Sequence, residues 1–437
     1  MRLSIDGTSI RWNGFDRPLD LVAEGVELYG GRALPIARVP AMSLSLSVRG
    51  LLQGELVPRR IELLRPHLRV ERLEDGAFRF GLADAEAPSD TAASEAVGRL
   101  LSALRGNPAI SGDPLAAIDA VSVTGGRITL DDRMLGINWY APVADIDLRR
   151  TEGGVVGTAR LDVELEGRTV RLEADLDYGT DTGTTRAELR VDNLVPADLA
   201  DRDPVLAPLA VLASPVRGTI RASFGTTFVP LSTTFILEAG AGVLRIDDFY
   251  PEPVRVASLA LSGEIDLQGG VMSIERFAAD LGGPRLEGRA TVTDRAGLLD
   301  IAANAAVTTM PTDLLATYWP PGVGRNAREW VTKNLSRGIV RRAELDVVAR
   351  APARDLGEMQ AVSLDGRIEF DGVTVTYLES MPPVTHVAGS ATFDLTRFAI
   401  SVAGGSLRDL AVTEADVVIS GLETKREVID IEIVAAG

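Results

Sequence analysis

Side chains that could perform catalysis are scarce in this sequence. Its 437 residues include two histidines, His67 and His386, and no cysteine. Neither histidine has a serine or carboxylate at a motif spacing, so neither a Ser-His-Asp triad nor a histidine-based zinc site is predicted. His386 lies in an alternating run, 384–388, and is expected on a strand face. The lack of cysteine excludes disulfides, cysteine metal sites and thiol nucleophiles. We therefore expect a protein that is not an enzyme and has no catalytic residue, metal site or cofactor.

Paired carboxylates are the next candidates for chemistry. A glycosidase needs two carboxyl groups flanking the scissile bond, and an acidic loop with a glycine can mimic a calcium site. The acidic pairs are Asp131–Asp132, Asp145 with Asp147, and Asp247–Asp248, and the loop-like group is Asp177, Asp181 and Gly183. We interpret both kinds of group as turns and solvated strand faces. Aspartate hydrogen-bonds its own backbone in turns, and neighbouring arginines can pair with it across strands.

The stretch 318–340 contains a Pro-Pro pair and the sequence GVG at 322–324. It lacks the lysine of a P-loop and the third glycine of a dinucleotide fingerprint, so a phosphate-binding loop is not favoured. The prolines end the preceding segment, and the sequence predicts a helix from about Asn326 to Leu335. Gly338 is expected to end this helix as a C-cap. One apolar stripe follows helical spacing and predicts a packing role: Val323, Ala327, Trp330, Val331 and Leu335.

Strands must position all of these residues, because alternation with a period of two dominates the chain. Runs at 44–48, 128–130, 161–165 and 259–261 alternate apolar and polar residues, as half-buried strands do. A glycine followed by polar and apolar residues in alternation recurs at 126, 263, 288, 366 and 389. Self-similarity at about this spacing predicts a repetitive β architecture.

Helices are too few to cover so many strands. Besides the stretch 318–340, helical patterns occur only at Thr91–Arg105 and in the proline-interrupted segment Ala197–Leu212. A sheet with one apolar face must bury that face. We therefore expect a sheet that curls on itself, packs as a sandwich, or leaves an apolar groove for a ligand.

Composition narrows the possible partners. The formal net charge is −17, which argues against nucleic acid and against docking flat onto an anionic membrane. No run of about 18 apolar residues is present, so no membrane-spanning helix is predicted.

The segment Val26–Leu82 resembles the start of AsmA-like bacterial envelope proteins. The matching positions are Val39, Pro40, Leu44, Leu46, Leu51, Leu52, Gly54, Pro58, Ile61, Leu63, Pro66, Leu68, Val70, Arg72, Asp75 and Gly76. Trp319–Pro320 and the run from Arg328 to Gly338 are similar to the central region of the YhdP-like branch. These motifs are patterns of apolar and turn residues and carry no catalytic signature.

The resemblance implies a mainly β fold: an elongated, twisted β-sheet with a hydrophobic groove and few short helices. It implies passive conduction of phospholipids between the inner and outer membranes, with acyl chains and the two membrane surfaces as partners and no nucleic acid. Family members begin with an N-terminal transmembrane helix that this sequence lacks. We therefore expect a periplasmic portion of a longer protein, anchored to the inner membrane through that helix.

From these patterns and the resemblance we predict five segments of the chain and two sets of site residues. The segments are an N-terminal β unit at 1–82, a helical linker at 83–114, a repetitive body at 115–309, a helical insertion at 310–338 and a continuation at 339–437. The residues expected to line the groove are Ile128, Leu130, Ile220, Ile265, Leu267, Ile368, Phe370 and Phe393. The residues expected to gate it are Trp319, Trp330, Val331 and Leu335, with Arg325 and Arg328 as candidate head-group contacts.

Two alternative functions remain. The first is an envelope scaffold that assists outer-membrane protein assembly through exposed strand edges. The second is a carbohydrate-active enzyme, which would need carboxylates and aromatics clustered in a cleft, whereas aromatic residues make up only 5% of the chain.

Overall fold

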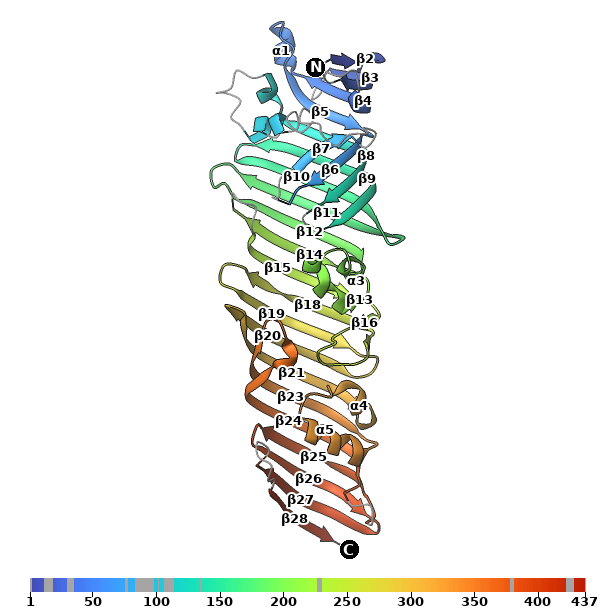
Figure 1. Cartoon of the computed structure of the whole chain (residues 1–437), viewed down its shortest axis with the longest axis vertical. Helices are drawn as coiled ribbons and strands as arrows, with labels where there is room; N and C mark the ends of the chain where they lie inside the picture. The colour runs from blue at the N-terminus through green and yellow to red at the C-terminus, as the bar shows by residue number, and fades with distance from the viewer. Residues whose placement is uncertain are drawn as a thin grey trace. The chain divides into compact units, whose positions relative to one another are not determined.

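The computed structural model describes residues 2–11, 19–29, 35–74, 78–82, 98–100, 102–105, 114–133, 136–225, 230–377, 381–421 and 428–436. Strands make up 66% of the structure and helices 13%, against roughly 20–25% strand in ordinary globular proteins. The prediction of a mainly β chain with one large sheet and few short helices is confirmed. The chain forms two compact units, and the second begins near Ser232 (Figure 1).

Unit 1 comprises Met1–Ala210 with Pro215–Leu231. Its strands are β1 (Arg2–Ser4), β2 (Gly7–Arg11), β3 (Asp20–Tyr29), β4 (Pro35–Leu46), β5 (Pro58–Leu64), β6 (His67–Arg72), β7 (Phe78–Leu82), β8 (Ala120–Asp132), β9 (Ile137–Thr151), β10 (Gly154–Leu165), β11 (Arg168–Gly179), β12 (Thr185–Leu194) and β14 (Val216–Phe224). Its short helices are α1 (Val48–Leu52), η1 (Pro114–Ala117), α3 (Ala197–Ala200) and η2 (Pro204–Val211), the last of which ends in unit 2.

The pairing in unit 1 is mixed. Strands β8, β9, β10, β11, β12 and β14 pair antiparallel in that order. Strands β5 and β6 both pair with β8 in parallel, and β3 pairs with β1, β2 and β4.

Two expected elements of unit 1 differ in detail. The strand expected at 44–48 ends at Leu46, because Ser47 caps a helix there: its side-chain oxygen accepts from the Gly50 backbone N–H at 3.3 Å. Of the helix expected over 91–105, residues 98–100 and 102–105 are helical, and residues 91–97 and 101 lie outside the described residues.

Unit 2 comprises Val211–Ser214 with Ser232–Gly437. Its strands are β13 (Leu212–Ala213), β15 (Pro230–Ala239, whose first two residues belong to unit 1), β16 (Gly242–Leu244), β17 (Val254–Val256), β18 (Ser258–Asp266), β19 (Val271–Asp280), β20 (Arg285–Arg295), β21 (Leu298–Pro311), β22 (Leu335–Ser336), β23 (Ile339–Pro352), β24 (Gln360–Val375), β25 (Val384–Asp394), β26 (Arg397–Leu407), β27 (Leu410–Ser420) and β28 (Val428–Ala436). Its helices are η3 (Thr312–Leu314), α4 (Leu315–Tyr318), α5 (Arg325–Asn334) and η4 (Leu356–Glu358).

Eleven strands of unit 2 form one antiparallel series: β15, β18, β19, β20, β21, β23, β24, β25, β26, β27 and β28. At about 4.8 Å between neighbouring strands, this series extends about 48 Å. The predicted repetition therefore corresponds to strands added one after another along one sheet.

The recurring glycines of unit 2 lie inside strands. An added Cβ on Gly366 of β24 would come within 2.1 Å of the Phe393 ring. Phe393 lies directly across from Gly366 in the register and covers its bare backbone. Aromatic residues opposite glycines stabilise curved sheets in this way, so the repeat favours a bent sheet with crowded inner positions.

Candidate functional site

The registers of unit 2 gather apolar residues into two unbroken rows on one face of the sheet. The first row is Leu237, Leu261, Phe277, Gly288, Ala305, Leu345, Gly366, Phe393, Phe398 and Ile419. The second row is Ala239, Leu259, Ala279, Leu286, Val307, Ala343, Ile368, Ala391, Ile400 and Val417. We call the face that carries these rows the apolar face. Across the ten strands from β15 to β27, neither row contains a polar side chain.

The opposite face, here the polar face, carries ion pairs. Arg350 of β23 donates to Asp300 of β21 at 2.7 Å. This hydrogen bond is the main cause that lowers the pKa of Asp300. Arg342 and Glu344 pair at 2.6 Å on the same face. These charged side chains are solvent-exposed or half-buried, so this side of the sheet is hydrated.

The apolar face is less exposed than the polar face but is not a closed core. Leu345 and Ile368 are half-buried, whereas their chain neighbours Glu344 and Arg367 on the polar face are exposed. Side chains on the concave side of a curved sheet converge and shield one another, so this difference assigns the apolar face to the concave side. A second layer packed across the face would bury these side chains almost completely.

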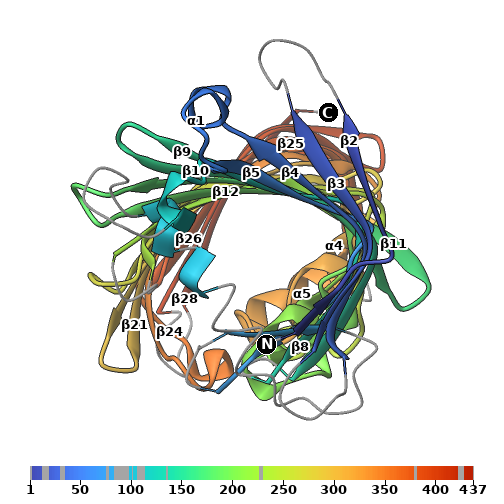
Figure 2. The same ribbon diagram turned by 90° about the horizontal axis from the view of Figure 1, so that it is seen from above.

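Helices α4 and α5 lie on the concave side of unit 2. Figure 2 shows strands that include β21, β24, β25 and β26 curving around them. None of the ten residues of α5 is buried. Trp330 of this helix is 46% exposed, so α5 leaves part of its own apolar surface uncovered.

The structure places four of the five groove residues predicted in unit 2 on the apolar face. Ile265 pairs with Met272, Ile368 with Ala391, and Phe370 with Gly389. The Phe393 ring stacks on that of Phe398 with a centroid separation of 5.6 Å.

Leu267 is the exception in unit 2. It lies in the turn after β18 and is 53% exposed. The strand ends at Asp266, whose carboxylate accepts from the backbone N–H groups of Gln268 and Gly269 at 3.0 and 2.9 Å. This aspartate turn removes Leu267 from the alternation that predicted it on the apolar face.

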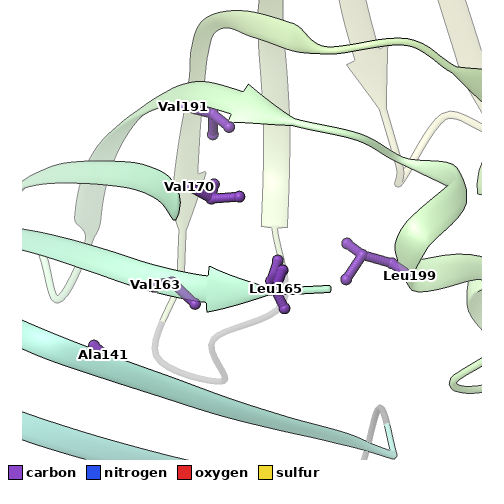
Figure 3. Packing of buried hydrophobic residues seen from close by; sticks show 6 residues of the cluster. All are labelled: Ala141, Val163, Leu165, Val170, Val191 and Leu199. Atoms are coloured by element: carbon purple, nitrogen blue, oxygen red, sulfur yellow. The ribbon is translucent and has the colours of Figure 1, made fainter. Parts of the chain in front are cut away.

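In unit 1 the predicted groove residues belong to a filled region. Ile128 packs against a buried cluster of Ala141, Val163, Leu165, Val170, Val191 and Leu199 (Figure 3). Leu199 comes from α3, and Leu206 and Leu209 of η2 pack on the same cluster. Leu130 pairs with Trp139, and Ile220 pairs with Leu189, both of which contact the cluster. Short helices thus cover the apolar surface of the sheet in unit 1, whereas the apolar face of unit 2 is only half-buried.

The polar groups of the GVG segment are used internally. The Trp319 indole N–H donates to the Val323 carbonyl at 2.8 Å. Arg328 donates through Nε to the Trp319 carbonyl at 2.8 Å and through Nη2 to the Ala316 carbonyl at 2.7 Å. Arg328 therefore ties α4 to α5, and its guanidinium is engaged with carbonyls.

Helix α4 is fastened to the sheet by two tyrosines. Tyr318 Oη donates to the Leu281 carbonyl at 3.1 Å, and Tyr250 Oη donates to the Tyr318 carbonyl at 2.6 Å. Burial raises the pKa of Tyr250, so this donor stays protonated at neutral pH. α4 is thus anchored, while α5 carries the exposed surface.

The helix predicted over 326–335 exists as α5, but Gly338 does not cap it. α5 ends at Asn334, and Leu335 is already extended and pairs with Val375 as part of β22. Gly338 has φ +69°, and an added Cβ would lie 2.5 Å from the Val373 backbone nitrogen. The glycine is needed because β24 passes too close for any side chain.

The gating residues differ in exposure. Trp330 is 46% exposed, and Trp319, Val331 and Leu335 are half-buried. Of the predicted stripe, Ala327, Trp330 and Val331 lie on α5, whereas Val323 precedes the helix and Leu335 belongs to β22. The stripe is only partly buried.

Several of the carboxylates considered as catalytic candidates are engaged by neighbouring groups. Asp131 and Asp132 pair with Arg69 and Arg72 across strands at 3.9 and 3.4 Å, and Asp145 accepts from the Gly125 N–H at 2.8 Å. His67 lies in unit 1 and His386 in unit 2. Within the described ranges, no three His, Asp or Glu residues come together as a metal site.

Comparisons of the chain with models of protein families, with characterised proteins and with solved structures gave no match. In the described part of the chain, no helix has both the length and the apolar character needed to cross a membrane.

Proposed function

We propose that this protein binds phospholipid acyl chains along the apolar face of unit 2 and lets them slide along it without covalent chemistry. The supporting observation is the pair of unbroken apolar rows, whose side chains are half-buried or buried on the concave side of the sheet. Each CH₂ group moved from water onto such a surface gains about 0.8 kcal/mol. A lipid tail lying across the strands therefore binds without specific contacts.

The resemblance to AsmA-like envelope proteins supports the setting. It rests on the residue pattern of Val26–Leu82 and on the segment around α5. Under this proposal the chain works in the periplasm as part of a path for phospholipids between the two bacterial membranes. Head groups remain in water at the open side of the curved sheet.

Mass spectrometry of lipid extracted from the purified full chain tests this proposal. We expect co-purified phospholipid, and we expect transfer of a fluorescent phospholipid between two vesicle populations to speed up when the protein is added. Protein that carries no lipid and leaves the transfer rate at its spontaneous value would contradict the proposal. Cross-links to outer-membrane proteins in the absence of lipid would favour the scaffold alternative instead.

A further inference from the structure

Helix α5 lies in a basic segment of an acidic protein. Residues 322–342 contain six cations and one carboxylate, a net charge of +5, whereas the whole chain carries −17. The net charge of the whole chain disfavours an anionic partner. Charge interactions in water are screened within about 8–10 Å, however, so a local basic patch next to an apolar surface can still attract an anionic partner at short range.

Ion pairs occupy only some of these cations. Arg341 pairs with Asp371, and Arg342 pairs with Glu344. Arg328 is held by two carbonyls. Arg325 and Lys333 are exposed and make no ion pair with any described residue. These two cations lie two turns apart on α5, about 12 Å along its axis and within about 80° of each other around it.

The two sides of α5 differ sharply in character. Arg325, Glu329 and Lys333 follow one another at intervals of four residues and form a charged side. Ala327, Trp330 and Val331 fall on the other side, and Trp330 keeps 46% of its surface exposed. A helix with an exposed aromatic and apolar side and a cationic side is typical of helices that lie at a lipid–water interface.

We propose that α5 is a head-group site selective for anionic phospholipids, in which Arg325 and Lys333 bind the phosphate and Trp330 contacts the start of the acyl chains. This inference rests on the proposed function. The occupant is a lipid because the site joins phosphate-binding cations to uncovered apolar surface on the concave side of the sheet (Figure 2). A free phosphate ion would use only the cations.

The site contains its own opposing charge. Glu329 lies between Arg325 and Lys333 on the charged side of the helix and weakens the attraction for phosphate. Its replacement by glutamine must therefore act in the opposite direction to the loss of the cations. A purely structural role for the helix predicts no such change of sign.

The test measures which lipid the full-length chain takes up from vesicles of phosphatidylcholine mixed with phosphatidylglycerol. The variants are Arg325→Gln/Lys333→Gln, which removes both cations, and Glu329→Gln, which removes the carboxylate. The control is Arg276→Gln/Arg354→Gln, which removes the same charge from two exposed arginines outside α5. At about a fivefold effect per surface cation, the double variant loses roughly 25-fold in preference for the anionic lipid. Glu329→Gln gains about fivefold, and the control is unchanged.

Three outcomes separate this inference from the proposed function. Uptake of both lipids with the same ratio in every variant overturns the head-group site and leaves lipid binding standing. No uptake of either lipid overturns both. The third outcome concerns Trp330 fluorescence, whose signal the Trp330→Phe variant identifies. If inorganic phosphate alone changes this fluorescence as much as phosphatidylglycerol vesicles do, the site binds free phosphate and the lipid assignment is overturned.

Discussion

A carboxylate placed on the apolar face should block lipid binding, whereas the same change one residue away should not. Val292 and Thr291 are neighbours on β20. Val292 pairs with Met272 and Ile301 on the apolar face and is half-buried, whereas Thr291 points to the polar face and is exposed. The matched variants Val292→Asp and Thr291→Asp add the same charge to the same strand on opposite sides of the sheet.

The magnitudes follow from this placement. Full burial of a valine-sized side chain is worth about 1.5–3 kcal/mol, so the half-buried Val292 contributes about 1 kcal/mol and its replacement leaves the unit folded. Thr291→Asp should change the free energy of unfolding by less than about 0.5 kcal/mol. An acyl chain that loses contact with about two CH₂ groups binds roughly 15-fold more weakly, and the cost of desolvating the carboxylate adds to this loss.

The assay is the phospholipid content of each purified variant, together with vesicle-to-vesicle transfer, after denaturant melts have shown that both variants are folded. We expect Val292→Asp to lose most of its bound lipid and Thr291→Asp to match the parent protein. The same loss is expected for Ile265→Asp, which also lies on the apolar face. Equal lipid content in folded Val292→Asp and Thr291→Asp would refute the assignment of lipid to this face.

Three further predictions concern stability. Gly338→Ala puts a Cβ 2.5 Å from the Val373 backbone nitrogen at a residue with φ +69°, so we expect a loss of about 1–3 kcal/mol in urea unfolding; an unchanged unfolding midpoint would contradict the close approach. Arg328→Met removes two hydrogen bonds to carbonyls of the α4–α5 junction, so we expect faster proteolysis within 315–334 at nearly unchanged global stability, and equal cleavage rates would show that Arg328 is not the tie. Asp300 has a pKa lowered chiefly by its hydrogen bond from Arg350; its stabilising contribution is therefore fully present above the unfolded-state pKa of about 3.9 and is lost as the pH falls through the lower folded-state pKa. We expect Arg350→Gln to reduce the acid-dependent part of the stability curve, and acid melts of the two proteins that superimpose would count against this pairing.

Local patterns predicted the elements well where one periodicity dominated. The alternating runs at 128–130, 161–165 and 259–261 lie in β8, β10 and β18, and the helix expected from about 326 to 335 is α5. Alternation was informative because a strand with one wet and one apolar face must repeat every two residues. It failed at Leu267, where an aspartate turn ends the strand while the residue pattern continues.

The candidate site was less accessible from the sequence. Arg325 and Arg328 were equivalent candidates for a head group, but only the fold shows that Arg328 is engaged with the carbonyls of Ala316 and Trp319. The role of Gly338 was also misassigned, because a glycine after a helix is usually a cap. Its actual constraint is the backbone of β24, more than thirty residues away in the chain.

The sequence by itself determined the chemistry of each strand: one apolar side, one charged side, and too few helices to cover the apolar side. Those properties are local, since they depend only on the order of side chains along an extended backbone. Tertiary structure decided which apolar residues stand next to one another, because a register shift of one residue would turn a strand's apolar side to water. It also decided which parts are filled: α3 and η2 close the apolar cluster of unit 1, whereas α5 leaves the rows of unit 2 half-exposed.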